Sequence, residues 1–115
     1  MDDWGALKDK ERATKRLRGH LPKLAAISCK TINENLITAK NNEIRIRKAG
    51  HIPFLFTELD VAKALVRLKK RISKNPEDAE KIFERSIDHT KKPGYTAWLF
   101  GSMSWRIISL ARVRQ

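Results

Sequence analysis

Apolar residues recur at helical spacing along most of the chain and predict about five helices around one small core. Apolar positions three or four residues apart form one face of an α-helix, whereas strict alternation indicates a strand. Each expected helix begins near a capping residue or a proline, which are typical helix starts. The expected helices cover about residues 3–18, 22–40, 57–74, 76–89 and 96–113. We therefore expect a mainly α fold in one domain, residues 1–115, with a basic N-terminal helix at about 3–18.

The stretch 43–56 leaves two structures open. Residues 43–47 alternate polar and apolar side chains, which is the period of a strand. Gly50 could then turn the chain and residues 52–56 could return, giving one short β-hairpin at 43–56. The alternative is a helix that continues to Lys48 and is followed by an apolar loop.

The stretch 22–40 also has two interpretations. Residues 24–36 resemble the turn and recognition helix of a helix-turn-helix, in which a small residue precedes an aliphatic residue and a serine. They depart from that pattern at Ala26, where glycine is usual, and at Pro22, which would interrupt the first helix. The resemblance implies that three polar side chains face the major groove: Lys30, Asn33 and Asn35. In the alternative, one continuous helix spans 22–40 and places three apolar residues in the core: Ile27, Ile32 and Leu36.

The expected helix at 96–113 is apolar on most of its sides. A helix of this kind is normally central in a core or covered by a partner. Two arrangements fit this segment equally: it is the central helix of a monomer, or it forms the interface of a homodimer.

Several classes of function find no support in the residues. Cys29 is the only cysteine, so neither a disulfide within the chain nor a cysteine-based zinc site can form. The histidines His20, His51 and His89 have no metal-ligand spacing, and we find no catalytic motif. We therefore expect no enzyme, no metal and no cofactor. The sequence has no signal-peptide pattern and no apolar run long enough to span a bilayer, so we expect an intracellular protein, cytoplasmic or nuclear and not secreted.

The charge changes the picture most. The 115 residues carry a net charge of +12, of which +6 lies in residues 1–56, +1 in 57–90 and +5 in 91–115. Self-repulsion of this size opposes compaction unless a polyanion neutralises it. Cations that contact phosphates also gain affinity by releasing condensed counterions. The candidate phosphate-binding residues are Lys8, Lys10, Arg12, Lys15, Arg16, Arg18, Lys30, Arg45, Arg47, Lys48, Arg67, Lys70 and Arg71, followed by Lys63, Lys74, Arg106, Arg112 and Arg114.

These features predict a small basic protein that binds nucleic acid through phosphates, such as a regulator or a viral or phage-type DNA or RNA binder. Aromatic residues are 7% of the chain, which favours a duplex over stacked single strands and leaves DNA and RNA undecided. The alternative is a protein–protein module, an adaptor or inhibitor whose basic faces dock on an acidic partner. We expect a homodimer through the apolar C-terminal segment and do not expect membrane association.

Overall fold

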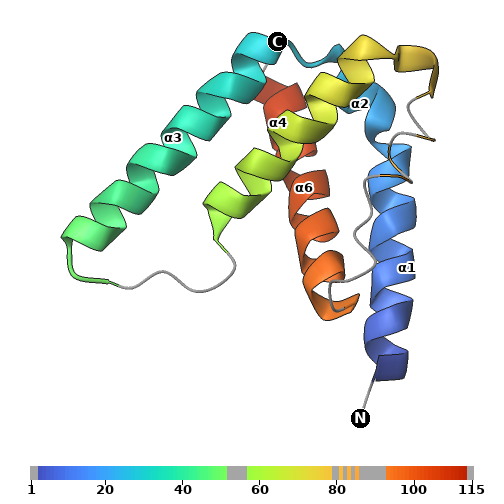
Figure 1. The fold of residues 1–115 in the computed structure, drawn as a ribbon, viewed down its shortest axis with the longest axis horizontal. Helices are drawn as coiled ribbons and strands as arrows, with labels where there is room; N and C mark the ends of the chain where they lie inside the picture. The colour runs from blue at the N-terminus through green and yellow to red at the C-terminus, as the bar shows by residue number, and fades with distance from the viewer. Residues whose placement is uncertain are drawn as a thin grey trace.

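The structure is a computed structural model that describes residues 3–51, 57–78, 81, 83, 85 and 93–113 (Figure 1). These residues form five α-helices, one short 3-10 helix and no strand, so the mainly α fold is confirmed. The molecule is flat, with extents of 43 × 41 × 23 Å. The elements are α1 Asp3–Gly19, α2 Leu21–Ala26, α3 Cys29–Lys48, α4 Glu58–Lys74, η1 Pro76–Asp78 and α6 Pro93–Val113.

The core lies where α1, α2, α4 and α6 meet. Helices α1 and α6 make the most extensive contact in the fold, and they run side by side in the same direction (Figure 1). Helix α4 crosses α6 and carries α3 on its other flank. The largest fully buried side chains come from all parts of this core: Leu17, Leu24, Leu65, Ile72, Phe83 and Ile107. Burial of such side chains contributes about 1.5–3 kcal/mol each and holds the helices in fixed positions.

The continuous helix considered for 22–40 is wrong, because the chain breaks between α2 and α3. Ile27 has an extended backbone (ψ 133°), and Ser28 is the N-cap of α3. The Ser28 hydroxyl accepts a hydrogen bond from the backbone N–H of Thr31 at 3.1 Å. Serine at an N-cap typically contributes about 1 kcal/mol, because it satisfies a backbone donor that has no partner in the first turn.

A buried lysine holds the end of α2 in place. Lys69 of α4 is only 6% exposed, and its Nζ donates to the carbonyl oxygens of Leu24 at 3.2 Å and Ala25 at 2.8 Å. The last carbonyls of a helix have no partners within the helix and carry partial negative charge. The ammonium group therefore closes the C-terminal end of α2 and ties it to α4.

Of the two structures considered for 43–56, the helix is found for residues 43–48, and the first strand of the hairpin is wrong. Two side-chain pairs one turn apart support the helix here: Arg45 donates to the Asn42 amide oxygen, and Arg47 lies 3.7 Å from the Glu43 carboxylate. Helix α3 ends at Lys48 with Ala49 as its C-cap, and Gly50 follows with a φ of +89°, which glycine adopts at little cost. The second half of the hairpin, residues 52–56, lies outside the described residues.

The helices expected near 57–74 and 96–113 are found, with one change of boundary. Helix α4 starts with the expected capping box, in which the Thr57 backbone N–H donates to Asp60 Oδ2 at 3.0 Å. Helix α6 begins at Pro93, three residues before the expected start, because proline is well suited to a first turn. In the expected helix 76–89, the structure shows η1 and helical conformation at residues 81, 83 and 85, and the other residues of 79–89 lie outside the described part.

Helix α6 occupies the centre of the molecule and still leaves one flank open. It buries Phe100, Met103 and Ile107 against the rest of the chain, whereas Trp105 on its outer side is 65% exposed. No helix in the described part of the chain is long and apolar enough to cross a membrane.

Candidate nucleic-acid interface

The outward side of α4 carries a group of five exposed cations with a common orientation. Residues 63, 67, 70, 71 and 74 follow helical spacing, so they share the face opposite the buried Leu65 and Ile72. No acidic residue lies between Val61 and Lys74. We call this surface the α4 basic face; its residues, all exposed, are Lys63, Arg67, Lys70, Arg71 and Lys74.

The α4 basic face is rigid because of what lies beneath it. Six residues of α4 are buried, and one of them, Lys69, donates hydrogen bonds to the carbonyl oxygens of Leu24 and Ala25. The face runs about 16 Å along the helix at 1.5 Å per residue. A duplex carries one negative charge per about 1.7 Å of its axis, so this length of duplex offers more phosphates than the face has cations.

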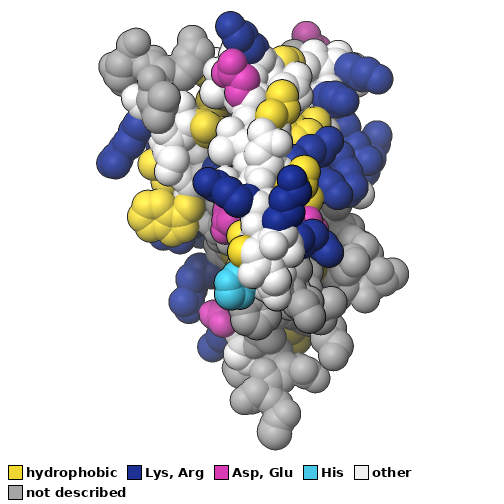
Figure 2. Space-filling view, turned by 90° about the vertical axis from the view of Figure 1, so that its left-hand side faces the viewer, with side chains coloured by type: hydrophobic (Ala, Val, Ile, Leu, Met, Phe, Trp, Pro, Cys, Tyr) yellow, Lys and Arg dark blue, Asp and Glu magenta, His cyan; other side chains and the backbone are white. Residues whose placement is uncertain are grey.

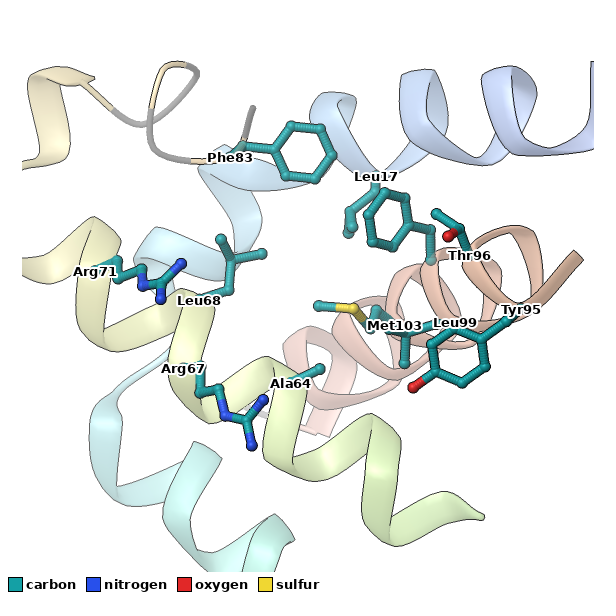
Figure 3. Close-up of a pocket in the computed structure, with 11 residues that line it drawn as sticks. Leu17, Ala64, Arg67, Leu68, Arg71, Phe83, Tyr95, Thr96, Leu99 and Met103 are labelled. Carbon is teal, nitrogen blue, oxygen red and sulfur yellow. The ribbon is translucent and has the colours of Figure 1, made fainter. Parts of the chain in front are cut away.

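Two hollows border the α4 basic face, one at the C-terminal end of α4 and one beside its middle. One is lined by Arg71, Lys74, Asn75 and Arg85, and is a polar, cationic depression. The other is a pocket of about 310 Å³ with a mostly apolar lining. Figure 3 shows Arg67 and Arg71 reaching from α4 on one side of this pocket, and Leu99 and Met103 from α6 on the other.

Helix α1 carries a second group of exposed cations: Lys8, Arg12, Lys15 and Arg16. Asp9 and Glu11 lie among them, so this group is less purely cationic than the α4 basic face. Two predicted residues of α1 are only partly exposed, Lys10 and Arg18. The Arg18 guanidinium packs 5.8 Å from the centre of the Phe83 ring, which turns it toward the core.

The predicted residues on α3 lie on a more mixed surface. Lys30, Arg45, Arg47 and Lys48 are exposed, but Arg47 pairs with Glu43 and Arg45 with Asn42. Ile37 and Ile44 are 56% and 52% exposed on the same helix. Figure 2 shows the side of the molecule where α3 lies, with hydrophobic side chains set among the Lys and Arg side chains.

The structure has a break between two helices where the helix-turn-helix interpretation expects a turn, but only two of the three side chains expected to face a groove are exposed. Lys30 and Asn33 are exposed on α3, whereas Asn35 is half-buried. Helix α2 has only six residues. Groove recognition by α3 therefore stays a prediction.

The cations of α6 do not form a group: Arg106 is in an ion pair, and Arg112 lies apart from it near the end of the helix. Arg106 is half-buried and pairs with Glu58 at the start of α4, and burial lowers the pKa of its guanidinium. Arg112 is exposed near the end of the helix, and Arg114 lies outside the described residues. Helix α6 thus contributes mainly packing to the candidate interface.

Among the described residues, His20 is a second titratable group whose pKa is shifted by its surroundings. Its pKa lies below the ordinary value of 6.5, first because of burial and then because of the neighbouring cations Lys23 and Arg16. Its Nδ1 is buried, and no hydrogen-bond partner for it is found among the described residues. No group of three or more His, Cys, Asp or Glu side chains suited to a metal is found in the described part of the chain.

Sequence reasoning named all five residues of the α4 basic face but gave α4 no special weight. The net charge of residues 57–90 is only +1, because seven acidic residues, five of them after Asn75, offset eight cations in that count. The helical spacing of residues 63–74 was the better signal, since it places these cations on one face. The sequence analysis did not name Lys69, which ties α4 to α2, or Arg85, which lines the cationic depression beside Arg71 and Lys74.

Comparison with known proteins adds nothing to this geometry: no family model, curated protein or solved structure matches the chain. Only the surface of the molecule therefore points to a function.

Proposed function

We propose that the protein binds double-stranded nucleic acid through phosphate contacts made by the α4 basic face. The observation that carries the proposal is the alignment of five exposed cations on one rigid helix face without a carboxylate among them. A rigid face needs little ordering on binding, so more of its interaction energy contributes to affinity. Phosphate contacts of this kind fix a protein on the duplex without reading its sequence. The protein would act inside the cell, in the cytoplasm or nucleus, as a binding protein and without a cofactor.

The salt dependence of binding tests the proposal. Five phosphate contacts on B-DNA give a slope of about −4.5 for log K against log salt, which is a loss of about 500-fold in affinity between 50 and 200 mM. The measurement is fluorescence anisotropy of labelled duplex DNA and duplex RNA over this salt range. A flat salt dependence would refute phosphate binding.

Charge-neutralising variants locate the contacts. The triple variant K63Q/K70Q/K74Q removes three cations from the α4 basic face and should make the slope shallower by about 2.7 on B-DNA. The matched control K30Q/K40Q/K48Q removes the same charge from exposed positions of α3 and should leave the slope unchanged. A slope that changes in the α3 variant and not in the α4 variant would transfer the interface to α3.

A second candidate function, docking on an acidic protein partner, is favoured by the apolar pocket beside Arg67 and Arg71. An acidic segment with one apolar side chain could place its carboxylates on the two arginines and its apolar group against Leu99 and Met103. A partner captured through this site would survive nuclease treatment, and R67Q/R71Q would release it. Capture that nuclease abolishes supports the nucleic-acid function.

A further inference from the structure

The α1/α6 pair forms a shallow groove on a part of the surface that the α4 basic face does not include. Small residues from both helices open the groove, with Ala13 on one side and Ala97 and Gly101 on the other. Arg12 and Arg16, one helical turn apart, stand on the α1 side. The groove is also lined by Gly5, Asp9, Gly94 and Trp98.

This groove and the α4 basic face lie on opposite sides of α6. The pocket beside Arg67 and Arg71 uses α6 residues 95, 96, 99, 100 and 103, whereas the groove beside Arg12 and Arg16 uses 94, 97, 98 and 101. At 100° per residue, these two sets point to roughly opposite sides of the helix. The arginines of α1 and α4 are therefore separated by the body of the molecule.

From this arrangement we infer that the α1/α6 groove is a second phosphate-binding surface and that the protein bridges two duplexes. Among the described residues that line the groove, Arg12 and Arg16 exceed the single carboxylate of Asp9, and Lys15 adds an exposed cation nearby on α1. Because the duplex is stiff, with a persistence length of about 500 Å, bending it around a molecule 43 Å across to reach both surfaces is costly. One duplex therefore occupies one side, and the opposite cationic surface takes a second duplex.

A capture experiment tests the bridging, which rests on the proposed function. Duplex DNA is immobilised on beads, and retention of a second, labelled duplex is measured with and without the full chain. The wild type should retain the labelled duplex. R12Q/R16Q should still bind the immobilised duplex through the α4 basic face but lose at least tenfold of the retained label. The matched control K23Q/K40Q removes two exposed cations from α2 and α3 that are not candidate phosphate-binding residues, and should retain the label like the wild type.

Three other outcomes have distinct meanings. A wild type that binds the beads but retains no second duplex overturns bridging and leaves the proposed function intact. A wild type that does not bind the immobilised duplex overturns both. If R12Q/R16Q retains the label as well as the wild type, the second duplex is held elsewhere, for example by a second copy of the chain, and the groove is not the second site.

Tryptophan fluorescence gives a separate measurement at the groove. In the variant W4F/W105F, Trp98 is the only tryptophan, and it lines the groove. When duplex is titrated into this variant, the emission of Trp98 should change during the binding of one of the two equivalents. The same titration with R12Q/R16Q added should show no change in emission. Emission that stays constant through both equivalents overturns the assignment of the groove.

Discussion

Replacing Lys69 with methionine isolates the effect of a single buried ammonium group. Methionine keeps an unbranched side chain of similar length, so K69M removes the hydrogen bonds to Leu24 and Ala25 and largely preserves the packing. The carbonyl of Leu24 also accepts from the backbone N–H of Ile27 at 3.2 Å, so the loss falls mainly on Ala25. Both carbonyls belong to the last residues of α2, whose position depends on this contact.

The magnitude follows from the two bonds and their cost. Hydrogen bonds to a charged group contribute about 1.5–3 kcal/mol each, and burying the ammonium offsets part of this gain. We expect K69M to lower the free energy of unfolding by about 2 kcal/mol. With about 2.1 cal/mol/K of unfolding entropy per residue, this corresponds to a drop in Tm of roughly 8 °C for this chain.

The neighbouring residue provides a matched control. K70M makes the same chemical change and loses the same charge, but Lys70 is exposed on the α4 basic face. We expect K70M to change stability by less than about 0.5 kcal/mol, as is usual for surface substitutions. Urea denaturation followed by circular dichroism measures both variants. Equal stabilities of K69M and K70M would show that the cost of burying the ammonium cancels its bonds, and would refute the reasoning.

Three further predictions concern pH, capping and assembly. Because the folded-state pKa of His20 is lowered by burial and by two nearby cations, the unfolded chain binds more protons; stability should therefore be full above pH 6.5 and fall as the pH drops through 6.5. H20Q should flatten this loss in urea midpoints and H51Q should not, and equal acid sensitivity in H20Q would contradict it. S28A should lose about 1 kcal/mol while S28D keeps most of the cap, and an unchanged urea midpoint in S28A would argue against the cap. For the homodimer expected through 96–113, light scattering should show a dimer that W105E converts to a folded monomer; a monomeric wild type would contradict it.

The helices that sequence predicted best are those where local and distant signals agree. Helix α4 has a capping box at Thr57 and Asp60 and an apolar face that the core uses fully, so its start and its face followed from spacing. Residues 43–48 were ambiguous because alternation of Ile44 and Ile46 suits a strand. In the helix both isoleucines are about half exposed, so their burial does not favour one alternative over the other. The side-chain pairs one turn apart favour the helix.

The break between α2 and α3 at Ile27 and Ser28 could not be predicted from the sequence alone. Serine is a good N-cap, but no glycine or proline marks this turn, and the stretch also reads as one amphipathic helix. The contact that holds the break comes from Lys69, more than forty residues away along the chain. Lys69 lies four residues after Leu65 and three before Ile72, on the buried side of α4, but the sequence analysis did not single it out. Its carbonyl partners became visible only in three dimensions.

The sequence identified the cations of the candidate site, but it did not show which of them form one surface. Counting charge by segment emphasised α1, whereas the folded chain puts its cleanest basic face on α4. Arg18 illustrates the difference, because it belongs to the basic cluster in sequence and yet packs against Phe83.

The pairing of α1 with α6 has a consequence for how the protein is made. Helix α1 is synthesised well before its main packing partner, which is not available until residues 93–113 have been made. At about 5–20 residues per second, α1 waits several seconds without its partner. Contacts between such distant segments also slow folding, since a long loop must close before they form. Newly made chains therefore cannot complete this core until α6 has been synthesised, and a premature stop codon before α6 would leave a product without Phe100, Met103 and Ile107 in its core.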